Sequence, residues 1–213
     1  MNAAIFDMDG TLIDSMPYWQ TISTKYFESI GIKVDDKTRE KLEKIIIPDA
    51  ALYMKEKFNL KDSVNEISDK IFAMLDREYE FTVPIKGNVK CVLDKFKEKG
   101  YKMCIATGSL RHMVELVTKR LGIDDYFEFI ITCREAGAQK SESAKIYEEA
   151  LIKLGSKREE TYVFEDDPDA ALTAKKSGFK VVGIYEEYYK DRVDDIKQTA
   201  DIYIEDYNEF EML

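Results

Sequence analysis

The sequence predicts an α/β protein: a parallel sheet covered by helices, with a helical segment inserted after the first strand. Short apolar runs alternate with helix-like runs along most of the chain, and this alternation is typical of a parallel sheet with helical crossovers. The apolar runs are continuous, which indicates strands buried on both faces. One long stretch carries only the helical pattern and breaks the alternation.

Six runs rich in strand-forming residues define the expected sheet. They are 3–6, 102–107, 127–132, 161–164, 180–184 and, more weakly, 201–204. Helices are expected between them, because a glycine, the usual residue just beyond a helix C-terminus, follows several helix-like runs. These glycines are Gly31, Gly100, Gly122, Gly155 and Gly178.

The stretch 17–79 contains no expected strand. Trp19, Ile22 and Tyr26 recur at helical spacing, and Asp35 and Pro48 are expected helix starts. Proline and glycine at 15–17 and 83–87 mark expected hinges. We therefore expect a core of residues 1–15 and 81–213 and a helical insert of residues 16–80.

Composition excludes several classes of partner. The chain has 213 residues with 32 Lys plus Arg and 42 Asp plus Glu, so its net charge is 32 − 42 = −10. Such an acidic protein is not expected to bind a nucleic-acid backbone or an anionic membrane surface. No apolar run is long enough to span a membrane, and the N-terminus lacks the basic start of a signal peptide. Cys91, Cys104 and Cys133 are expected to be buried, reduced thiols of a cytoplasmic protein.

Polar residues follow the strands at the edge where an open parallel sheet binds ligands. They are Asp7 and Asp9 after the first strand, Thr107, Gly108 and Ser109 after the second, Lys140 after the third, and Glu165 and Asp166 after the fourth. Four carboxylates brought together would repel one another. A divalent cation would resolve this repulsion, and an oxygen-only ligand set suits Mg²⁺, which substrate phosphate often completes.

The same residue types suit phosphoryl transfer. A carboxylate beside the metal can act as a covalent nucleophile and form an aspartyl-phosphate. A second carboxylate two residues further on can protonate the leaving oxygen and then activate water, while lysine and threonine hold the other phosphate oxygens. Simpler readings exist for single residues: Ser109 as the cap of a helix beginning near Leu110, Asp167 as a helix N-cap, and Lys140 as a solvated lysine.

The motifs resemble those of the haloacid dehalogenase-like (HAD) superfamily. Asp7-Met8-Asp9-Gly10-Thr11 is similar to its DxDGT signature. Thr107, Lys140 and the pair Glu165-Asp166 are similar to its second, third and fourth motifs. The insert resembles the cap of the subfamily that contains β-phosphoglucomutase and phosphoglycolate phosphatase. The resemblance covers essentially the whole chain and implies a Rossmann-like core with a helical cap.

The resemblance also implies a role for each matching residue. Asp7 would be the nucleophile, and Asp9 the general acid and base, with its backbone carbonyl as a Mg²⁺ ligand. Asp9 favours phosphoryl transfer over dehalogenation, because haloacid dehalogenases lack an acid at that position. Thr107 and the amides near Gly108 would bind phosphoryl oxygens, and Lys140 would neutralise the nucleophile and the phosphate. The metal site would comprise Asp7, Asp9, Glu165 and Asp166.

Three stretches depart from the family pattern. The third motif reads Gln139-Lys140-Ser141 where many relatives have Gly-Lys-Pro, and the run to Tyr147 is one residue longer. Trp19 stands where β-phosphoglucomutases have a histidine, and the region 44–49, where their arginine-containing specificity loop would lie, is largely apolar. Trp19 and the apolar region 44–49 weaken the resemblance to a mutase.

We therefore expect a Mg²⁺-dependent phosphatase that acts on a small phosphorylated metabolite. A phosphosugar mutase and a non-catalytic regulatory or binding protein with the same fold are the alternatives. Tyr18, Trp19 and the loop 44–49 are the candidates for contacts with the leaving group, and Gly108 and Ser109 for contacts with the phosphate. We expect a monomer or a weak homodimer.

Overall fold

A computed structural model describes residues 2–211 of the chain. These residues form two compact units, the second of which is the segment Ser15–Val83. The first unit consists of the residues up to Asp14 and those from Pro84 onward. The chain thus leaves the first unit after its first strand and returns beside a proline.

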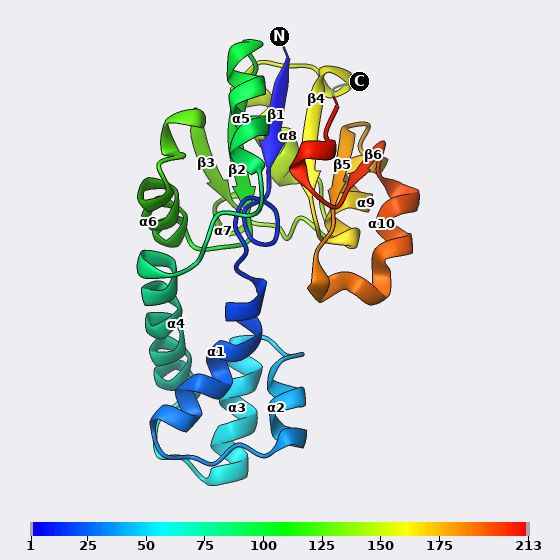
Figure 1. Cartoon of the computed structure of the whole chain (residues 1–213). Coiled ribbons are helices and arrows are strands. Elements are labelled where there is room, and N and C mark those ends of the chain that lie inside the picture. Colours follow the sequence, from blue (N-terminus) through cyan, green and yellow to red (C-terminus); the bar gives the residue numbers. More distant parts are fainter. Residues whose placement is uncertain (1, 212–213) are drawn as a thin grey trace. The chain divides into compact units, whose positions relative to one another are not determined.

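The first unit contains a six-stranded sheet in the order β3-β2-β1-β4-β5-β6 (Figure 1). Every neighbouring pair of strands is parallel, which confirms the predicted fold class. The strands are β1 (Ala3–Phe6), β2 (Lys102–Thr107), β3 (Phe129–Thr132), β4 (Thr161–Glu165), β5 (Lys180–Ile184) and β6 (Ile202–Ile204). The order reverses at β1, so the carboxyl ends of β1, β2 and β4 form the switch point where such sheets bind ligands.

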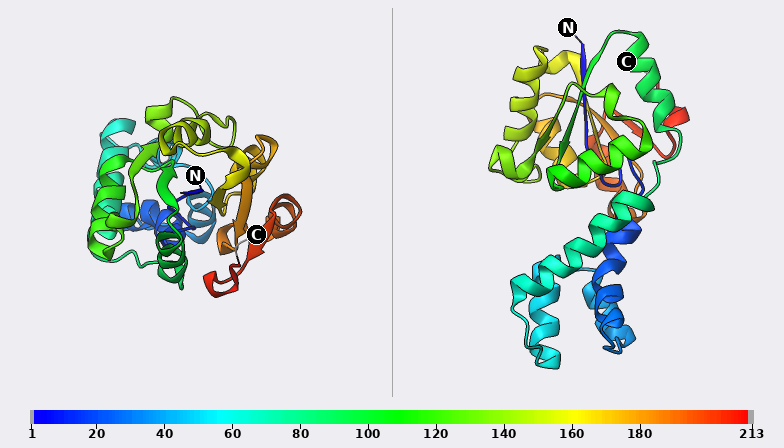
Figure 2. Two further views of the ribbon diagram at one scale, coloured as in Figure 1. Left: turned by 90° about the horizontal axis from the view of Figure 1, so that it is seen from above. Right: turned by 90° about the vertical axis from the view of Figure 1, so that its left-hand side faces the viewer.

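Helices cover both faces of this sheet (Figure 2). They are α5 (Val89–Glu98), α6 (Arg111–Leu121), α7 (Cys133–Ala136), α8 (Lys145–Leu154), α9 (Pro168–Lys176) and α10 (Val193–Thr199), with 3₁₀ turns η1 (Asp124–Tyr126), η2 (Arg158–Glu160), η3 (Glu187–Arg192) and η4 (Tyr207–Glu209). On one face, Ile5 and Val163 pack in a single cluster with Ile146 of α8 and Ala171 of α9. Successive strand residues point to opposite faces, so the neighbours of these strand residues form a second core.

The second core is aromatic. Phe6 of β1 stacks on Phe164 of β4 with ring centroids 4.4 Å apart. Phe96 of α5 meets both rings edge-on, and Phe210, just beyond η4, stacks on Phe96. The C-terminal segment is therefore bound to the sheet through its aromatic side chains.

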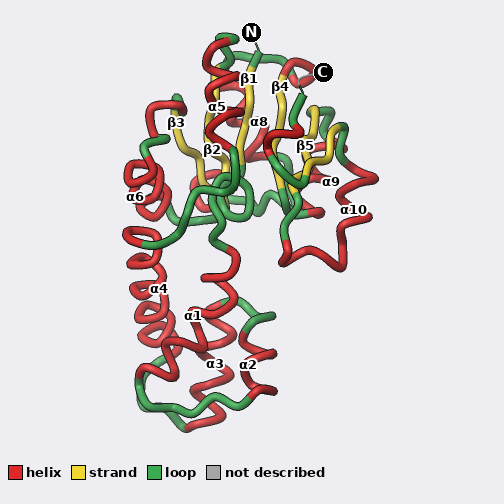
Figure 3. Tube along the Cα trace, in the orientation of Figure 1, coloured by secondary structure: helices red, strands yellow, loops and turns green. Residues whose placement is uncertain are grey.

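The second unit is helical, and all of its residues lie within the described part of the chain (Figure 3). Its helices are α1 (Met16–Ser29), α2 (Asp36–Leu42), α3 (Ile47–Phe58) and α4 (Val64–Phe81). The N-cap Ser63 of α4 exchanges hydrogen bonds with Glu66, and Asp35 caps α2 as predicted. Ile22, Met54, Ile71 and Leu75 are fully buried and supply the core of this unit.

Several local predictions need correction. Strand β3 begins at Phe129 rather than 127, because Phe127 ends the 3₁₀ turn η1. The expected loop 44–49 is shorter, because α3 begins at Ile47 with a proline in its first turn. Cys91 is exposed, whereas Cys104 and Cys133 are buried as predicted. Over residues 2–211, the helices include none with the length and apolar character that crossing a membrane requires.

Candidate active site

The loop after β1 brings Asp7 to the centre of the sheet edge. Asp7 follows the strand directly and is 4% exposed. The loop turns tightly, since the amides of Thr11 and Leu12 both donate to the Met8 carbonyl. Gly10 has a φ of +80°, and a Cβ there would lie 2.3 Å from Oδ2 of Asp166. Only glycine lets this loop approach so close to the end of β4.

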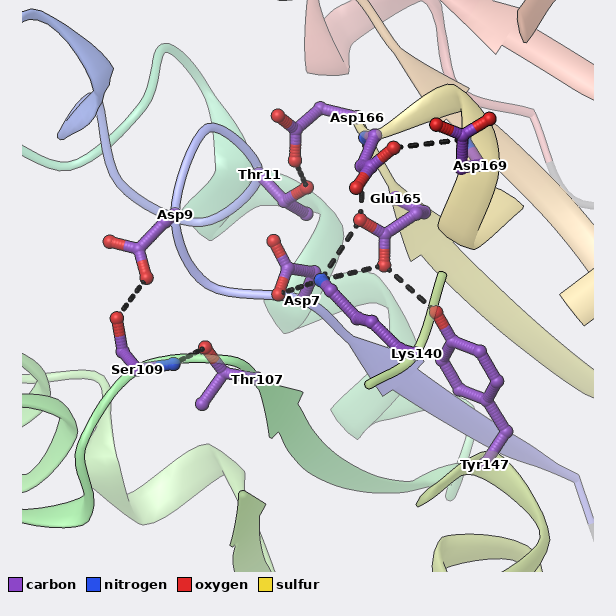
Figure 4. A network of polar contacts seen from close by, with 11 residues as sticks. Asp7, Asp9, Thr11, Thr107, Ser109, Lys140, Tyr147, Glu165, Asp166 and Asp169 are labelled. Atoms are coloured by element: carbon purple, nitrogen blue, oxygen red, sulfur yellow. Dashed lines mark hydrogen bonds and ion pairs between the residues drawn. The ribbon is translucent and has the colours of Figure 1, made fainter. Parts of the chain in front are cut away.

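Lys140 links the acidic side chains of this edge. Its ammonium forms an ion pair with Oδ1 of Asp7 and donates to both oxygens of Glu165, at 3.0 and 2.9 Å (Figure 4). The lysine is itself 12% exposed, and Glu165 is fully buried. The chain brings Lys140 here on a loop that Thr173 of α9 supports, by donating its hydroxyl to the Ser141 carbonyl.

Asp166 completes an acidic cluster at the end of β4. It accepts a 2.8 Å hydrogen bond from the Thr11 hydroxyl. Asp7, Glu165 and Asp166 each offer an oxygen within 4.8 Å of the others, and all three are buried. Three buried carboxylates with one lysine are an unusual arrangement without a cation, so these residues fit a hard divalent metal ion. The Asp9 carboxylate is not part of this group.

The protonation of the cluster reflects its burial. Burial raises the pKa of Asp7, although Lys140 acts in the opposite direction. Burial raises the pKa of Glu165 to about 8, and burial together with the charge of Asp7 raises the pKa of Asp166 well above its usual range. Burial opposes the charge of Lys140, but the carboxylates of Asp7 and Glu165 outweigh it and raise the lysine pKa. The acids need a further positive charge to ionise together.

The loop after β2 contributes a hydroxyl pair. Thr107 is fully buried, and its Oγ1 accepts a 3.0 Å bond from the Ser109 amide. The Ser109 hydroxyl donates to Oδ2 of Asp9 at 2.6 Å. The simpler reading of Ser109 as a helix cap is wrong, because the N-cap of α6 is Leu110. The exposed Gly108 lies between these two hydroxyls in the chain.

Comparison with known proteins identifies the family. A model for haloacid dehalogenase-like hydrolases matches residues 4–184, which includes every one of these strand ends. The chain belongs to the haloacid dehalogenase-like hydrolase family. This confirms the predicted resemblance.

Individual relatives are similar over most of their length. A phosphorylated carbohydrates phosphatase of Thermotoga maritima is 24% identical over 180 residues, covering 84% of this chain and 83% of that protein. The pyrophosphatase PpaX of Anoxybacillus flavithermus is 27% identical over 187 residues, covering 86% of this chain and 83% of that protein. A solved β-phosphoglucomutase from Clostridium difficile has a TM-score of 0.74 at 19% identity, covering 100% of this chain and 94% of that chain, a likeness of fold.

In this HAD-like hydrolase, the site residues predicted from the sequence for the first unit form two groups. One group is the cluster at the ends of β1 and β4 with Lys140. The other is Asp9 with Ser109 and Thr107 beside it (Figure 4). Tyr18 and Trp19 lie in α1 of the second unit. There the Trp19 indole N–H donates to the Tyr79 hydroxyl at 2.7 Å.

Two tyrosines of the HAD-like core are polar partners of the site that sequence reasoning missed. Tyr147 of α8 donates to Oε2 of Glu165 at 3.0 Å, and Tyr207 of η4 donates to the Thr11 carbonyl at 2.9 Å. Tyr147 has the spacing of an apolar helix stripe, and Tyr207 stands in an acidic C-terminal stretch. Neither position carries a local sign of a polar role.

Proposed function

We propose that this chain is a Mg²⁺-dependent phosphatase that hydrolyses a small phosphorylated metabolite through an aspartyl-phosphate on Asp7. One observation carries the proposal: Lys140 bridges Asp7 and Glu165, within a buried three-carboxylate cluster at a sheet switch point. A nucleophile held beside a cation and a metal-binding set of oxygens is what phosphoryl transfer requires. The names of the phosphatase relatives point to the same class of reaction.

The chemistry follows from the positions of these groups. An oxygen of Asp7 attacks phosphorus, and the bond from phosphorus to the leaving oxygen breaks. Asp9 gives that oxygen a proton. Asp9 then takes a proton from a water molecule that attacks the phosphorus of the aspartyl-phosphate, which releases inorganic phosphate and restores Asp7. The 2.6 Å bond from Ser109 orients the Asp9 carboxylate for both transfers.

The remaining groups handle charge. The proposed metal site comprises Asp7, Asp166 and the Asp9 backbone carbonyl as direct ligands, with Glu165 beside them in the same acidic cluster. Bound Mg²⁺ would offset the negative charge of the carboxylates and the phosphoryl group. Lys140 provides a further positive charge at Asp7, while Thr107 and the amides near Gly108 donate to phosphoryl oxygens.

The substrate is proposed only by class. The core residues recognise phosphate, so selectivity falls to the helical unit, with Tyr18, Trp19 and the segment from Lys44 as candidates. The relatives' names point to sugar phosphates and pyrophosphate as first substrates to test. We place the enzyme in the cytoplasm, since its cysteines are free, as a monomer or weak homodimer.

The test is a phosphate-release screen with and without Mg²⁺. It covers sugar phosphates, pyrophosphate, nucleotides, phosphoglycolate and flavin mononucleotide, with Asp7→Asn as the control. Hydrolysis that needs Mg²⁺ and disappears in Asp7→Asn supports the proposal. Retained Mg²⁺-dependent hydrolysis in Asp7→Asn contradicts the assignment of Asp7 as the nucleophile. If a bisphosphorylated sugar primes isomerisation of a sugar phosphate faster than it is itself hydrolysed, the protein is a mutase. No turnover of any ester, with Mg²⁺ still bound, indicates a binding protein.

A further inference from the structure

The hydroxyl of Tyr147 lies at the end of a buried polar chain. Tyr147 is 1% exposed, and its ring packs against Phe179 in the core between the sheet and α8. Its hydroxyl donates to Glu165, which binds Lys140, which binds Asp7 (Figure 4). A hydroxyl adds nothing to the packing of an apolar helix face, so the function of this hydroxyl is to be sought in its bond to Glu165.

Glu165 is saturated by donors of the chain itself. Its Oε1 accepts from Lys140 at 3.0 Å and from the Asp167 amide at 3.3 Å. Its Oε2 accepts from Lys140 at 2.9 Å and from Tyr147 at 3.0 Å. The ionised carboxylate, the form expected once a metal ion is bound, has about four lone-pair positions. These four bonds therefore direct Glu165 toward the lysine rather than toward a metal ion.

The position of the Lys140 ammonium depends on the orientation of the Glu165 carboxylate. A lysine ammonium has three donors; two are directed to Glu165 and one to Asp7. Its loop reads Gln139-Lys140-Ser141, with no proline to restrict the backbone beside the lysine. Glu165 is thus the anchor for the ammonium, and the Tyr147 hydroxyl and the Asp167 amide keep that anchor in one orientation.

We propose that Tyr147 is a positioning residue whose hydroxyl fixes Glu165 so that Lys140 stays against Asp7. The inference rests on the proposed function, because only that function gives Lys140 a phosphoryl group to bind. It assigns Glu165 to the lysine and leaves Asp7 and Asp166 as the side chains that hold the metal directly.

The test compares Tyr147→Phe with Tyr203→Phe. Both changes remove one hydroxyl, and the Tyr203 hydroxyl on β6 is buried with no hydrogen-bond partner in the described residues. Calorimetry would measure inorganic phosphate binding in saturating MgCl₂. We expect Tyr147→Phe to weaken it by about tenfold, the usual scale for a lost bond to a charged group, and Tyr203→Phe to leave it unchanged.

Two further measurements separate positioning from a general structural role. Mg²⁺ binding to Tyr147→Phe should stay within about twofold, whereas disturbing a metal ligand's support costs about 10–100-fold. In a Lys140→Met background, Tyr147→Phe should cause no further loss of phosphate affinity. An additive loss, a large change in Mg²⁺ affinity, or unchanged phosphate binding overturns the inference.

A crystal structure of Tyr147→Phe gives an answer that does not depend on turnover. We expect Glu165 to rotate and the Lys140 ammonium to move from Asp7. If wild-type protein binds no phosphate and hydrolyses no ester, the proposed function fails, and this structure alone decides the inference. Lys140 and Glu165 still joined as in the wild type, at 2.9–3.0 Å, would overturn it.

Discussion

The metal-free protein should lose stability as the pH rises from about 5 to about 8, contrary to the usual behaviour of acidic groups. Glu165 has a folded pKa of about 8, raised by its burial and by the charge of Asp7, against an ordinary value of 4.5. Between these values the folded protein keeps a proton that the unfolded chain has released. Stability therefore falls with rising pH in this window, by up to about 1.4 kcal/mol per pH unit for one such group.

Other ionisable groups do not reverse the predicted fall in stability with rising pH. Burial also raises the pKa of Asp7 and of Asp166, so both add to the same slope. Lys140 has its pKa raised above 10.5 and stays charged throughout the window. Glu135, whose pKa Arg111 lowers to about 2, gives stability that is lost only in acid as the pH falls through that value. The slope between pH 5 and 8 thus belongs to the acidic cluster.

Thermal unfolding in EDTA and in MgCl₂ measures this effect. For a chain of this size about 1 kcal/mol corresponds to about 2–4 °C, so a single group gives up to about 3–6 °C per pH unit. Mg²⁺ at the proposed site would bind the deprotonated carboxylates, so its stabilisation should be greater at pH 8 than at pH 5. Glu165→Gln is the matched control and should make the metal-free slope shallower, by the contribution of this one group. A metal-free Tm that is constant or rises across the window would refute the reasoning.

Three further outcomes follow from single contacts. Lys140→Met leaves Asp7 and Glu165 without their lysine, and should lower the metal-free unfolding free energy in urea by about 3–5 kcal/mol; an unchanged midpoint would contradict this. Ser109→Ala removes the 2.6 Å bond to Asp9 and should reduce kcat about tenfold with little change in KM; steady-state kinetics would reveal a KM effect alone if Ser109 only binds substrate. Tyr207→Phe leaves the buried Thr11 carbonyl without its 2.9 Å donor and should lower the unfolding free energy in urea by about 1–3 kcal/mol. An unfolding free energy equal to that of the wild type would contradict this prediction.

Local chemistry in the sequence was enough to predict most of the fold. Continuous apolar runs predicted the strands because both sheet faces are covered. All of the glycines expected at helix ends have positive φ, since only that backbone geometry closes the last turn without strain. Asp167 does cap α9, accepting the Asp169 amide. These features depend on neighbours only a few residues away.

Contacts between distant segments could not be predicted in the same way. Ser109 is a candidate phosphate contact in the sequence, with a helix cap as the simpler alternative, and neither expectation includes the bond of its hydroxyl to Asp9, 100 residues away. Tyr147 fits an apolar helix stripe, and only the folded chain reveals that its hydroxyl reaches Glu165. Such partners are set by how the strands and helices pack, which a single sequence does not record.

The charge of the site is consistent with an anionic substrate for a protein of net charge −10, as the proposed function requires. Asp7, Glu165 and Asp166 with Lys140 sum to −3 + 1 = −2 when all four are ionised. A divalent cation at the proposed site would cancel that charge, and a phosphate group would then meet a neutral site with a lysine, a buried threonine and backbone amides as donors. Without the cation, the same phosphate would face both the cluster and the acidic surface. Under the proposed function, substrate capture would therefore depend on the ion being bound first, and long-range steering by the protein's own field would contribute little.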